Sequence, residues 1–518
     1  MMFRISKWLV SEWPTLCVIV IGIATQLFLV IQPINTLIST ILPDDAFYYF
    51  GVVRNIVAGL GSTFDGISAT NGYHPLWTLV LIPLFKFFAS PFPDIQPIYI
   101  ALYVQVALNL ITAFLVARII SRFTRSQWVR ALGMVVWMLN PFLLYETVNG
   151  LETSLALFFF SIFFLFALRI EEGRPLTGGY ISMGLIGGLM TLARLDMAVY
   201  VLALLVWIIA RNGWQVGWGK AFSVGIWSAV PVVPYFLWNI WHFHMLLTSA
   251  SGAAVLENHM LIIQDHGPGW GQFFKAVVYS TQYELDHFFK RTGLFTLGAM
   301  FIGAFVVLTL QGVVRIPRKM RDSTLTWTLF CGFVLIFIAD ASIRWTARTW
   351  YFVSFDLFMA IVIVIVADRL FRMIEYKRIA AILIMSLVLF SFYVDWSKNL
   401  RGVNNPLYGE TALRDAAEWM NDYLPRGAIR GGFAAGIQGY FSDAPFVDLD
   451  GLVSNDVYTA LRKRQLWDYI RHHVVYISTD NGHFTYQYKS FLGIDDPFAR
   501  LRLITEIPGS ELKIYQVE

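Results

Sequence analysis

Long apolar stretches recur along most of this chain, and they constrain its fold more than any other feature. Eleven of them approach the ~20 residues that an α-helix needs to cross a bilayer. They fall at about 13–33, 97–117, 128–144, 151–168, 180–193, 197–210, 220–241, 293–311, 324–340, 350–367 and 379–394. Only 14% of the 518 residues are charged, whereas soluble domains carry about 25%. The sequence therefore predicts a polytopic α-helical membrane protein.

Basic residues between the apolar stretches predict the orientation. The most basic short loops are 118–130, 315–321 and 368–378, and cytoplasmic loops are enriched in Lys and Arg. A further apolar stretch, 75–92, contains a proline and a lysine. All three basic loops fall on the cytoplasmic side only if 75–92 does not cross. We therefore expect about 11 transmembrane helices, with 75–92 as a juxtamembrane or re-entrant segment.

The composition changes to that of a soluble domain near residue 396. The tail shows helix patterns at 411–424 and 458–472 and strand patterns at 428–433, 474–478 and 512–517. Its length of roughly 120 residues is near the usual domain size. We expect a transmembrane module over 1–395 and an extracytoplasmic α/β domain over 396–518. The first outer loop and its juxtamembrane helices would occupy 43–96.

Two adjacent carboxylates, Asp44 and Asp45, begin the first outer loop. Apolar residues then recur at helical spacing until Gly59 and Gly61 end the pattern, which predicts a helix in the membrane interface. The two carboxylates have two interpretations. They cap that helix, or one of them accepts a proton from a hydroxyl as a general base. The Tyr73-His74-Pro turn later in the loop favours a functional role.

Other charged residues lie at the outer ends of apolar stretches. Arg344 and Arg348 are four residues apart and would share one helical face, suited to phosphate oxygens or to lipid headgroups. Arg194 and Asp196 lie between two apolar segments, where charges are usually functional, although they could simply pair with each other. Glu152 begins an apolar stretch and either caps it or binds sugar.

Several other features argue against particular functions. His242, His244, His259 and His266 crowd one outer loop without a recognisable metal motif, so we expect a loop that closes over an acceptor groove. We expect no cofactor and no resident metal, with a divalent metal as an open alternative. The glycine-rich stretch 431–439 departs from dinucleotide-binding spacing and predicts turns and close packing. A net charge of +4 gives no reason to expect a nucleic acid partner.

Six short segments together resemble bacterial glycosyltransferases of the GT-C superfamily. They are spread over nearly the whole chain: Asp44-Asp45, 71–77, 150–153, 193–196, 439–442 and 447–452. The most similar members are polyprenyl-phosphate-dependent, arabinofuranosyl- and mannosyltransferase-like enzymes. The resemblance implies the GT-C fold, a sugar donor linked to a lipid phosphate, inversion, and a catalytic acid in the first outer loop. The family's preference for the first acid makes Asp44 the expected base and Asp45 the alternative.

These observations predict an external sugar transfer. Nucleotide sugars stay in the cytoplasm, so the donor would arrive on a polyprenyl phosphate, and the acceptor would be a glycan, lipid or protein, with a cell-envelope glycan favoured. Asp45, Tyr73 and His74 would bind sugar or acceptor. The enzyme would be a hexosyl- or pentosyltransferase of the plasma (inner) membrane, in contact with membrane lipids. The alternative is a polyprenyl-lipid or solute transporter or flippase, but such proteins place charges at mid-depth and often contain repeats.

Overall fold

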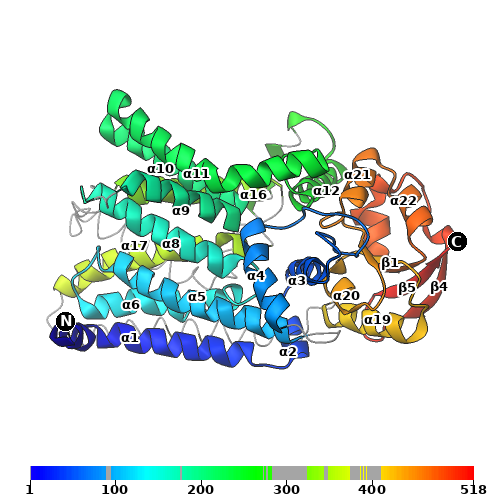
Figure 1. Ribbon diagram of the computed structural model, residues 1–518, viewed down its shortest axis with the longest axis horizontal. Helices are drawn as coiled ribbons and strands as arrows, with labels where there is room; N and C mark the ends of the chain where they lie inside the picture. Colours follow the sequence, from blue (N-terminus) through cyan, green and yellow to red (C-terminus); the bar gives the residue numbers. More distant parts are fainter. Residues whose placement is uncertain are drawn as a thin grey trace.

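The computed structural model describes residues 2–88, 95–174, 178–271, 324–343, 348–373 and 410–518, with isolated positions between 274 and 282 and at 386, 389 and 393. A helical bundle occupies one end of the molecule and a smaller α/β domain the other (Figure 1). The N-terminus lies at the end of the bundle that is far from this domain. Short helices lie between the two parts.

The bundle consists of apolar helices, most of them long. They are α1 (Met2–Val30), α5 (Gln96–Ile120), α6 (Gln127–Met138), α7 (Pro141–Glu146), α8 (Thr153–Glu171), α9 (Gly179–Ala193), α10 (Ala198–Asn212), α11 (Trp214–Phe243), α16 (Thr324–Ser342) and α17 (Ser354–Met373). Within the described residues, six segments are long and apolar enough to cross a membrane: 12–30 of α1, α5, α8, the short helix η1 (Leu195–Met197) with α10, α11 and α16. The expected crossings at 293–311 and 379–394 lie outside the described residues, apart from positions 386, 389 and 393.

The apolar stretch 128–144 does not form one helix. It divides into α6 and α7 at Asn140 and Pro141. Pro141 has no N–H to continue the hydrogen-bonding of α6, and the Asn140 side chain instead accepts the N–H of Phe142 at 3.2 Å to begin α7. The local chemistry of one Asn-Pro pair therefore overrides the apolar periodicity.

The helices between the two parts are α2 (Ile34–Thr40), α3 (Asp44–Val57) and α4 (Pro75–Phe88). With 14 residues, α4 spans roughly 21 Å, which is short of the ~30 Å hydrocarbon thickness. This length agrees with the prediction of a juxtamembrane segment. The expected helix α3 is present, but it is buried on nearly every side, including Tyr48, Tyr49 and Val52, because the C-terminal domain also packs against it.

The C-terminal domain contains a five-stranded mixed sheet in the order β2-β1-β3-β5-β4. Its strands are β1 (Arg430–Gly432), β2 (Phe446–Asp448), β3 (Tyr476–Thr479), β4 (Leu501–Glu506) and β5 (Lys513–Val517). The first three strands are parallel, and β5 is antiparallel to both β3 and β4. Its helices are α19 (Glu410–Tyr423), α20 (Ala435–Phe441), α21 (Asn455–Lys463), α22 (Leu466–His473) and α23 (Lys489–Leu492). The predicted helix 458–472 is two helices, because Arg464 adopts a left-handed conformation with φ of 55°.

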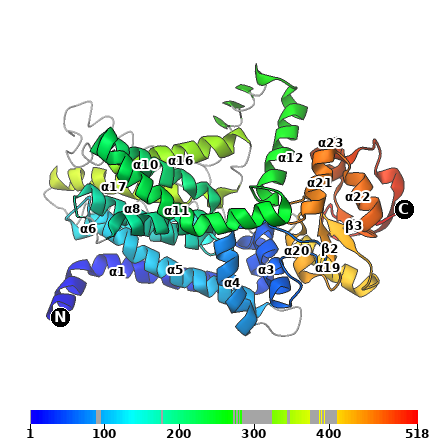
Figure 2. The same ribbon diagram turned by 45° about the horizontal axis from the view of Figure 1, so that its top comes forward.

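The C-terminal domain packs tightly on the first outer loop. A Cβ atom added to Gly436 of α20 would lie 2.1 Å from the Asp44 carbonyl oxygen, and one added to Gly72 would lie 1.9 Å from the Leu452 carbonyl oxygen. One cluster of buried apolar side chains also continues from the bundle through α3 into α19 and α20. A further helix, α12 (Ser249–His266), extends from the bundle beside α21 (Figure 2). The two parts therefore form a shared interface.

Candidate functional site

Two neighbouring cavities meet at Asp45 in the first turn of α3. The first, here called the bundle-side cavity, has a volume of about 250 Å³ and lies among α3, the start of α4, α12 and the ends of bundle helices. The second, the domain-side cavity, has a volume of about 310 Å³ and lies between the start of α3, α12 and the C-terminal domain. Asp45, Tyr48, Trp350 and Leu452 line both cavities.

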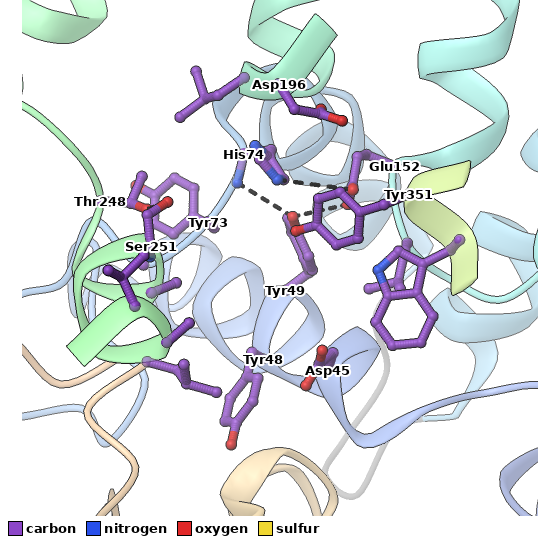
Figure 3. A pocket seen from close by; sticks show the side chains of 18 of the residues that line it. Asp45, Tyr48, Tyr49, Tyr73, His74, Glu152, Asp196, Thr248, Ser251 and Tyr351 are labelled. Atoms are coloured by element: carbon purple, nitrogen blue, oxygen red, sulfur yellow. Dashed lines mark hydrogen bonds and ion pairs between the residues drawn. The ribbon is translucent and has the colours of Figure 1, made fainter. Parts of the chain in front are cut away.

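Hydroxyl, imidazole and carboxylate groups converge on the bundle-side cavity (Figure 3). They come from segments far apart in the sequence: Asp45, Tyr48, Tyr49, Tyr73, His74, Glu152, Asp196, Thr248, Ser251, Asp340 and Tyr351. The sequence analysis selected five of these residues, namely Asp45, Tyr73, His74, Glu152 and Asp196. The structure thus brings together side chains from the first outer loop and from the starts of two bundle helices.

Tyr49 connects Glu152 to the turn that precedes α4. The Tyr49 hydroxyl donates to Glu152 Oε2 at 2.9 Å and accepts the His74 backbone N–H at 3.2 Å. Glu152 Oε1 lies 3.8 Å from His74 Nε2. Burial lowers the pKa of His74, against the opposing effect of Glu152, so the imidazole is neutral at pH 7. Glu152 makes no capping hydrogen bond to α8, and its carboxylate faces the cavity instead.

His74 and Tyr73 differ in whether their polar side-chain atoms have hydrogen-bond partners. Within the described part of the chain, His74 Nδ1 is buried without a hydrogen-bond partner. The Tyr73 hydroxyl lies 2.7 Å from Ser62 Oγ, so its polar group is held within the first outer loop. A buried polar atom without a partner is costly.

Arg194 is fully buried and holds a neighbouring segment in place. Its guanidinium forms two parallel hydrogen bonds to Asp196, of 2.8 and 2.9 Å. It also donates to the carbonyl oxygens of Trp350 at 2.8 Å and Tyr351 at 2.5 Å, which belong to the short helix η2 (Thr349–Phe352). Arg194 lines neither cavity, whereas Asp196 lines the bundle-side cavity. Arg194 and Asp196 therefore pair with each other, which is one of the two alternatives that the sequence left open.

Asp44 caps a helix of the C-terminal domain, not the helix in which it lies. Its two carboxylate oxygens accept the backbone N–H groups of Gly436 at 3.0 Å and Ile437 at 2.7 Å, in the first turn of α20. Ala435 donates its N–H to the Tyr48 hydroxyl at 3.0 Å. Two residues of α3 thus satisfy the N–H groups that a helix leaves unpaired at its start. Burial raises the pKa of Asp44 to about 7.

Asp45 faces the space between the two cavities. Burial raises the pKa of its carboxyl, and the positive charge of Arg348 opposes this effect. Arg348 lines the domain-side cavity. Arg344, which the sequence analysis paired with Arg348, lies outside the described residues.

Sequence reasoning missed several cavity residues. Asp340 lines the bundle-side cavity, and Glu410, His483, Gln487 and Tyr488 line the domain-side cavity. Asp340 carried a usable signal, because a carboxylate at the end of an apolar helix is rarely accidental. The others belong to no motif, and only the fold of the C-terminal domain brings them near Asp45.

The described residues contain no group of three or more His, Cys, Asp or Glu side chains arranged to hold a metal ion. Three of the four histidines considered as metal ligands lie in or at the end of helices: His242 lies in α11, His244 follows its last residue, and His259 lies in α12. The loop after α11 instead contributes α12, which forms a wall of both cavities.

A bundle of apolar helices, juxtamembrane helices after the first of them, and a C-terminal α/β domain define a membrane protein of the GT-C fold. The chain is similar to two crystal structures of the oligosaccharyltransferase of Archaeoglobus fulgidus. One, a complex with Zn and sulfate, has a TM-score of 0.56 at 12% identity and covers 96% of this chain and 73% of the other. The second is tethered through a disulfide bond to an acceptor peptide containing the NVT sequon. It has a TM-score of 0.51 at 11% identity and covers 99% of this chain and 75% of the other.

Residues 399–515 match a family described as a domain of unknown function, DUF8728. No curated protein matches the chain.

The arrangement of the helices and the similar structures confirm the predicted fold class.

Proposed function

We propose that this protein is a membrane glycosyltransferase that moves a sugar, with inversion, from a polyprenyl-phosphate donor to an extracytoplasmic acceptor, a glycan of the cell envelope. The observation that carries the proposal is the position of Asp45 between two cavities that contain carboxylate, hydroxyl and imidazole groups, one against the bundle and one against the C-terminal domain. The similar archaeal protein is an oligosaccharyltransferase with a tethered acceptor peptide, which supports group transfer to an acceptor.

In the proposed reaction, Asp45 is the general base. The acceptor hydroxyl gives its proton to Asp45 while its oxygen forms a bond to the anomeric carbon of the donor sugar. The bond between that carbon and the phosphate oxygen breaks, and its electron pair leaves with polyprenyl phosphate. Attack on the face of the anomeric carbon opposite the departing phosphate inverts the anomeric centre.

The geometry favours Asp45 over Asp44 as the base. Both carboxylate oxygens of Asp44 accept backbone N–H groups of α20, so a substrate proton would compete with these bonds. Asp45 lines both cavities, whereas Asp44 lines only the domain-side cavity. Burial raises the pKa of both carboxyl groups, so the choice rests on their positions and hydrogen bonds.

The bundle-side cavity is the proposed donor site. Tyr73, His74, Glu152 and Asp196 supply hydroxyl, imidazole and carboxylate groups for the sugar, and Arg194 would act indirectly by holding η2. Arg348, together with Arg344, is the proposed partner of the donor phosphate, because planar guanidinium groups suit phosphate oxygens. The active site and the C-terminal domain would face away from the cytoplasm of a plasma (inner) membrane.

The test uses purified protein in detergent with radiolabelled polyprenyl-phosphate sugars and envelope material from the producing cell. We expect label to leave the lipid and enter the envelope fraction, at a rate that depends on Asp45. In sealed vesicles, movement of the intact lipid donor across the bilayer, with no loss of its sugar, would contradict the proposal and support a transporter.

A further inference from the structure

The wall of the domain-side cavity lies at the carboxyl ends of three parallel strands. Ala434 follows β1, Asp450 follows β2, and His483 follows β3, and all three residues line the cavity. The strand order β2-β1-β3 means that the chain leaves β1 toward one side and reaches β3 on the other. In open α/β sheets, ligands bind at such a switch point, outside the carboxyl ends of the strands.

A π-helix, η3 (His483–Gln487), forms one side of this wall. π-helices are rare and frequently occur at functional sites. His483, Gln487 and the next residue, Tyr488, all line the cavity. The His483 ring stacks on Phe433 with centroids 4.6 Å apart and an interplanar angle of 11°, and its Nδ1 lies 3.2 Å from Asp480 Oδ1. The imidazole is therefore held in one orientation, and among the described contacts Nε2 is left for a ligand.

Hydrogen bonds connect this wall to α12. The Tyr488 hydroxyl lies 2.8 Å from Asp450 Oδ1 and 3.1 Å from Glu257 Oε2, and its single proton is available to either carboxylate. Gln487 Nε2 donates to Glu257 Oε1 at 2.7 Å. The polar groups are thus fixed before a ligand binds, which reduces the entropy lost on binding.

The charges at the sheet end of the cavity argue against a phosphate at that end, and Arg348, the proposed partner of the donor phosphate, borders the cavity next to η2. In doubly wound domains, phosphate binds at the N-terminus of the helix that follows the first strand. Here Asp44 occupies that position on α20. Asp45, Glu257, Glu410 and Asp450 add further carboxyl groups around the cavity, against Arg348 and His483.

Hydroxyl groups suit this lining best. Carboxylates only accept hydrogen bonds, whereas amide, phenol and imidazole groups both donate and accept, and each sugar hydroxyl can do both. Asp44, Asp450 and Glu257 already accept hydrogen bonds from the protein, so the hydroxyl groups of a ligand would meet the remaining polar groups, Asp45 and His483 Nε2 among them. The volume of about 310 Å³ lies within the range of about 300–1,000 Å³ for ligand sites.

We propose that the C-terminal domain carries a glycan-binding acceptor subsite at the switch point of its sheet, formed by His483, Gln487 and Tyr488. This inference rests on the proposed transferase function, because it assigns the domain-side cavity to the acceptor of that reaction. The hydroxyl to be glycosylated would point from this subsite toward Asp45, which borders the same cavity.

The experiment compares His483→Gln and Tyr488→Phe with two control variants, His472→Gln and Tyr423→Phe. The control side chains are 58% and 69% exposed on the same domain and do not line the cavity. Each full-length protein receives radiolabelled polyprenyl-phosphate sugars with or without envelope material. Release of free sugar to water reports donor binding and chemistry, and label in protease-resistant, periodate-sensitive material reports transfer to a glycan.

We expect His483→Gln and Tyr488→Phe to reduce transfer tenfold or more at limiting acceptor, while donor hydrolysis and both control variants stay within twofold of the wild type. An equal loss of transfer and hydrolysis, unchanged transfer, or label in protease-sensitive material would overturn the assignment. If the wild-type protein neither hydrolyses nor transfers the donor sugar, the proposed function itself fails, and this outcome is distinct from a defect confined to the two variants.

Discussion

Asp44 and Asp45 are adjacent, yet their carboxylates have different surroundings. Asp44 binds two N–H groups of α20, and Asp45 borders both cavities. We therefore expect Asp45→Asn to reduce turnover about 10²–10⁴-fold, the usual loss for a general base. Asp44→Asn keeps one accepting oxygen and loses the second cap hydrogen bond, so it should lower stability, while the turnover of the folded protein should fall less than in Asp45→Asn. Turnover at saturating donor and acceptor measures both effects, and the reverse ranking would identify Asp44 as the base.

The pH dependence of turnover depends on the charge of Arg348. Burial raises the pKa of Asp45 and Arg348 opposes that rise. A base must be ionised, so activity should fall as the pH decreases through this raised pKa, above the ordinary value of about 3.9. Arg348→Gln should move the acidic limb to still higher pH and raise the apparent donor KM.

The matched control for this prediction is Arg426→Gln, because Arg426 is 85% exposed on the C-terminal domain. It should leave the pH profile and the donor KM unchanged. An acidic limb that does not move in Arg348→Gln would mean that another group titrates.

At the residue scale, several side chains selected from the sequence line the two cavities, but the sequence did not predict the partner of each residue. Asp45, His74 and Glu152 were selected because carboxylates and imidazole at the outer ends of apolar stretches are seldom incidental. The cap that Asp44 provides to α20 joins residues 392 positions apart. No local pattern contains that pairing, so the sequence alone left Asp44 and Asp45 as alternatives.

At the scale of elements, local patterns predicted helices and strands better than their packing. Gly59 and Gly61, with φ of 81° and 76°, follow the end of α3, as their conformational freedom predicts. The burial of α3 depends on α20, which the sequence analysis did not identify as a helix. Its seven residues are too few for a clear helical period.

The position of η2 depends on Arg194. This buried guanidinium binds Asp196 and two carbonyl oxygens of η2, and η2 contributes Trp350 to both cavities. Arg194→Met leaves the Asp196 charge without its partner, and breaking a buried ion pair in this way costs about 3–5 kcal/mol. We expect a clearly lower unfolding temperature in detergent.

Arg194→Met should also lower activity, because η2 would lose the contacts that position it. Turnover should fall while the pH at half-maximal activity stays constant, because Arg194 lines neither cavity. The control is Arg471→Met, which removes an ion pair whose arginine is 49% exposed and should change neither property. A stable, fully active Arg194→Met protein would show that η2 is held by other contacts.

At the scale of the whole molecule, the positions of the basic residues decided the expected topology, which the apolar stretches left open. The apolar stretches alone did not decide whether 75–92 crosses the membrane, and the positions of the basic loops settled the expectation. In the structure, Arg130 of the first basic loop pairs with Glu12 of α1 at 2.5 Å, and the N-terminus lies at the end of the bundle far from the C-terminal domain (Figure 1). This arrangement motivates the last prediction.

We expect the C-terminal domain to face outward and the loop 118–130 to face the cytoplasm. Single cysteines replace Thr459 of α21 and Arg125 of the basic loop, both exposed, in a protein lacking Cys17 and Cys331. In intact cells, with any outer barrier made permeable to the reagent, a membrane-impermeant thiol reagent should label the cysteine at 459 and spare the one at 125. Both should react after the membrane is opened with detergent, which controls for accessibility. Labelling of position 125 alone in intact cells would reverse the orientation and place both cavities on the cytoplasmic side. Nucleotide sugars are available there, so a lipid-linked donor would no longer be required.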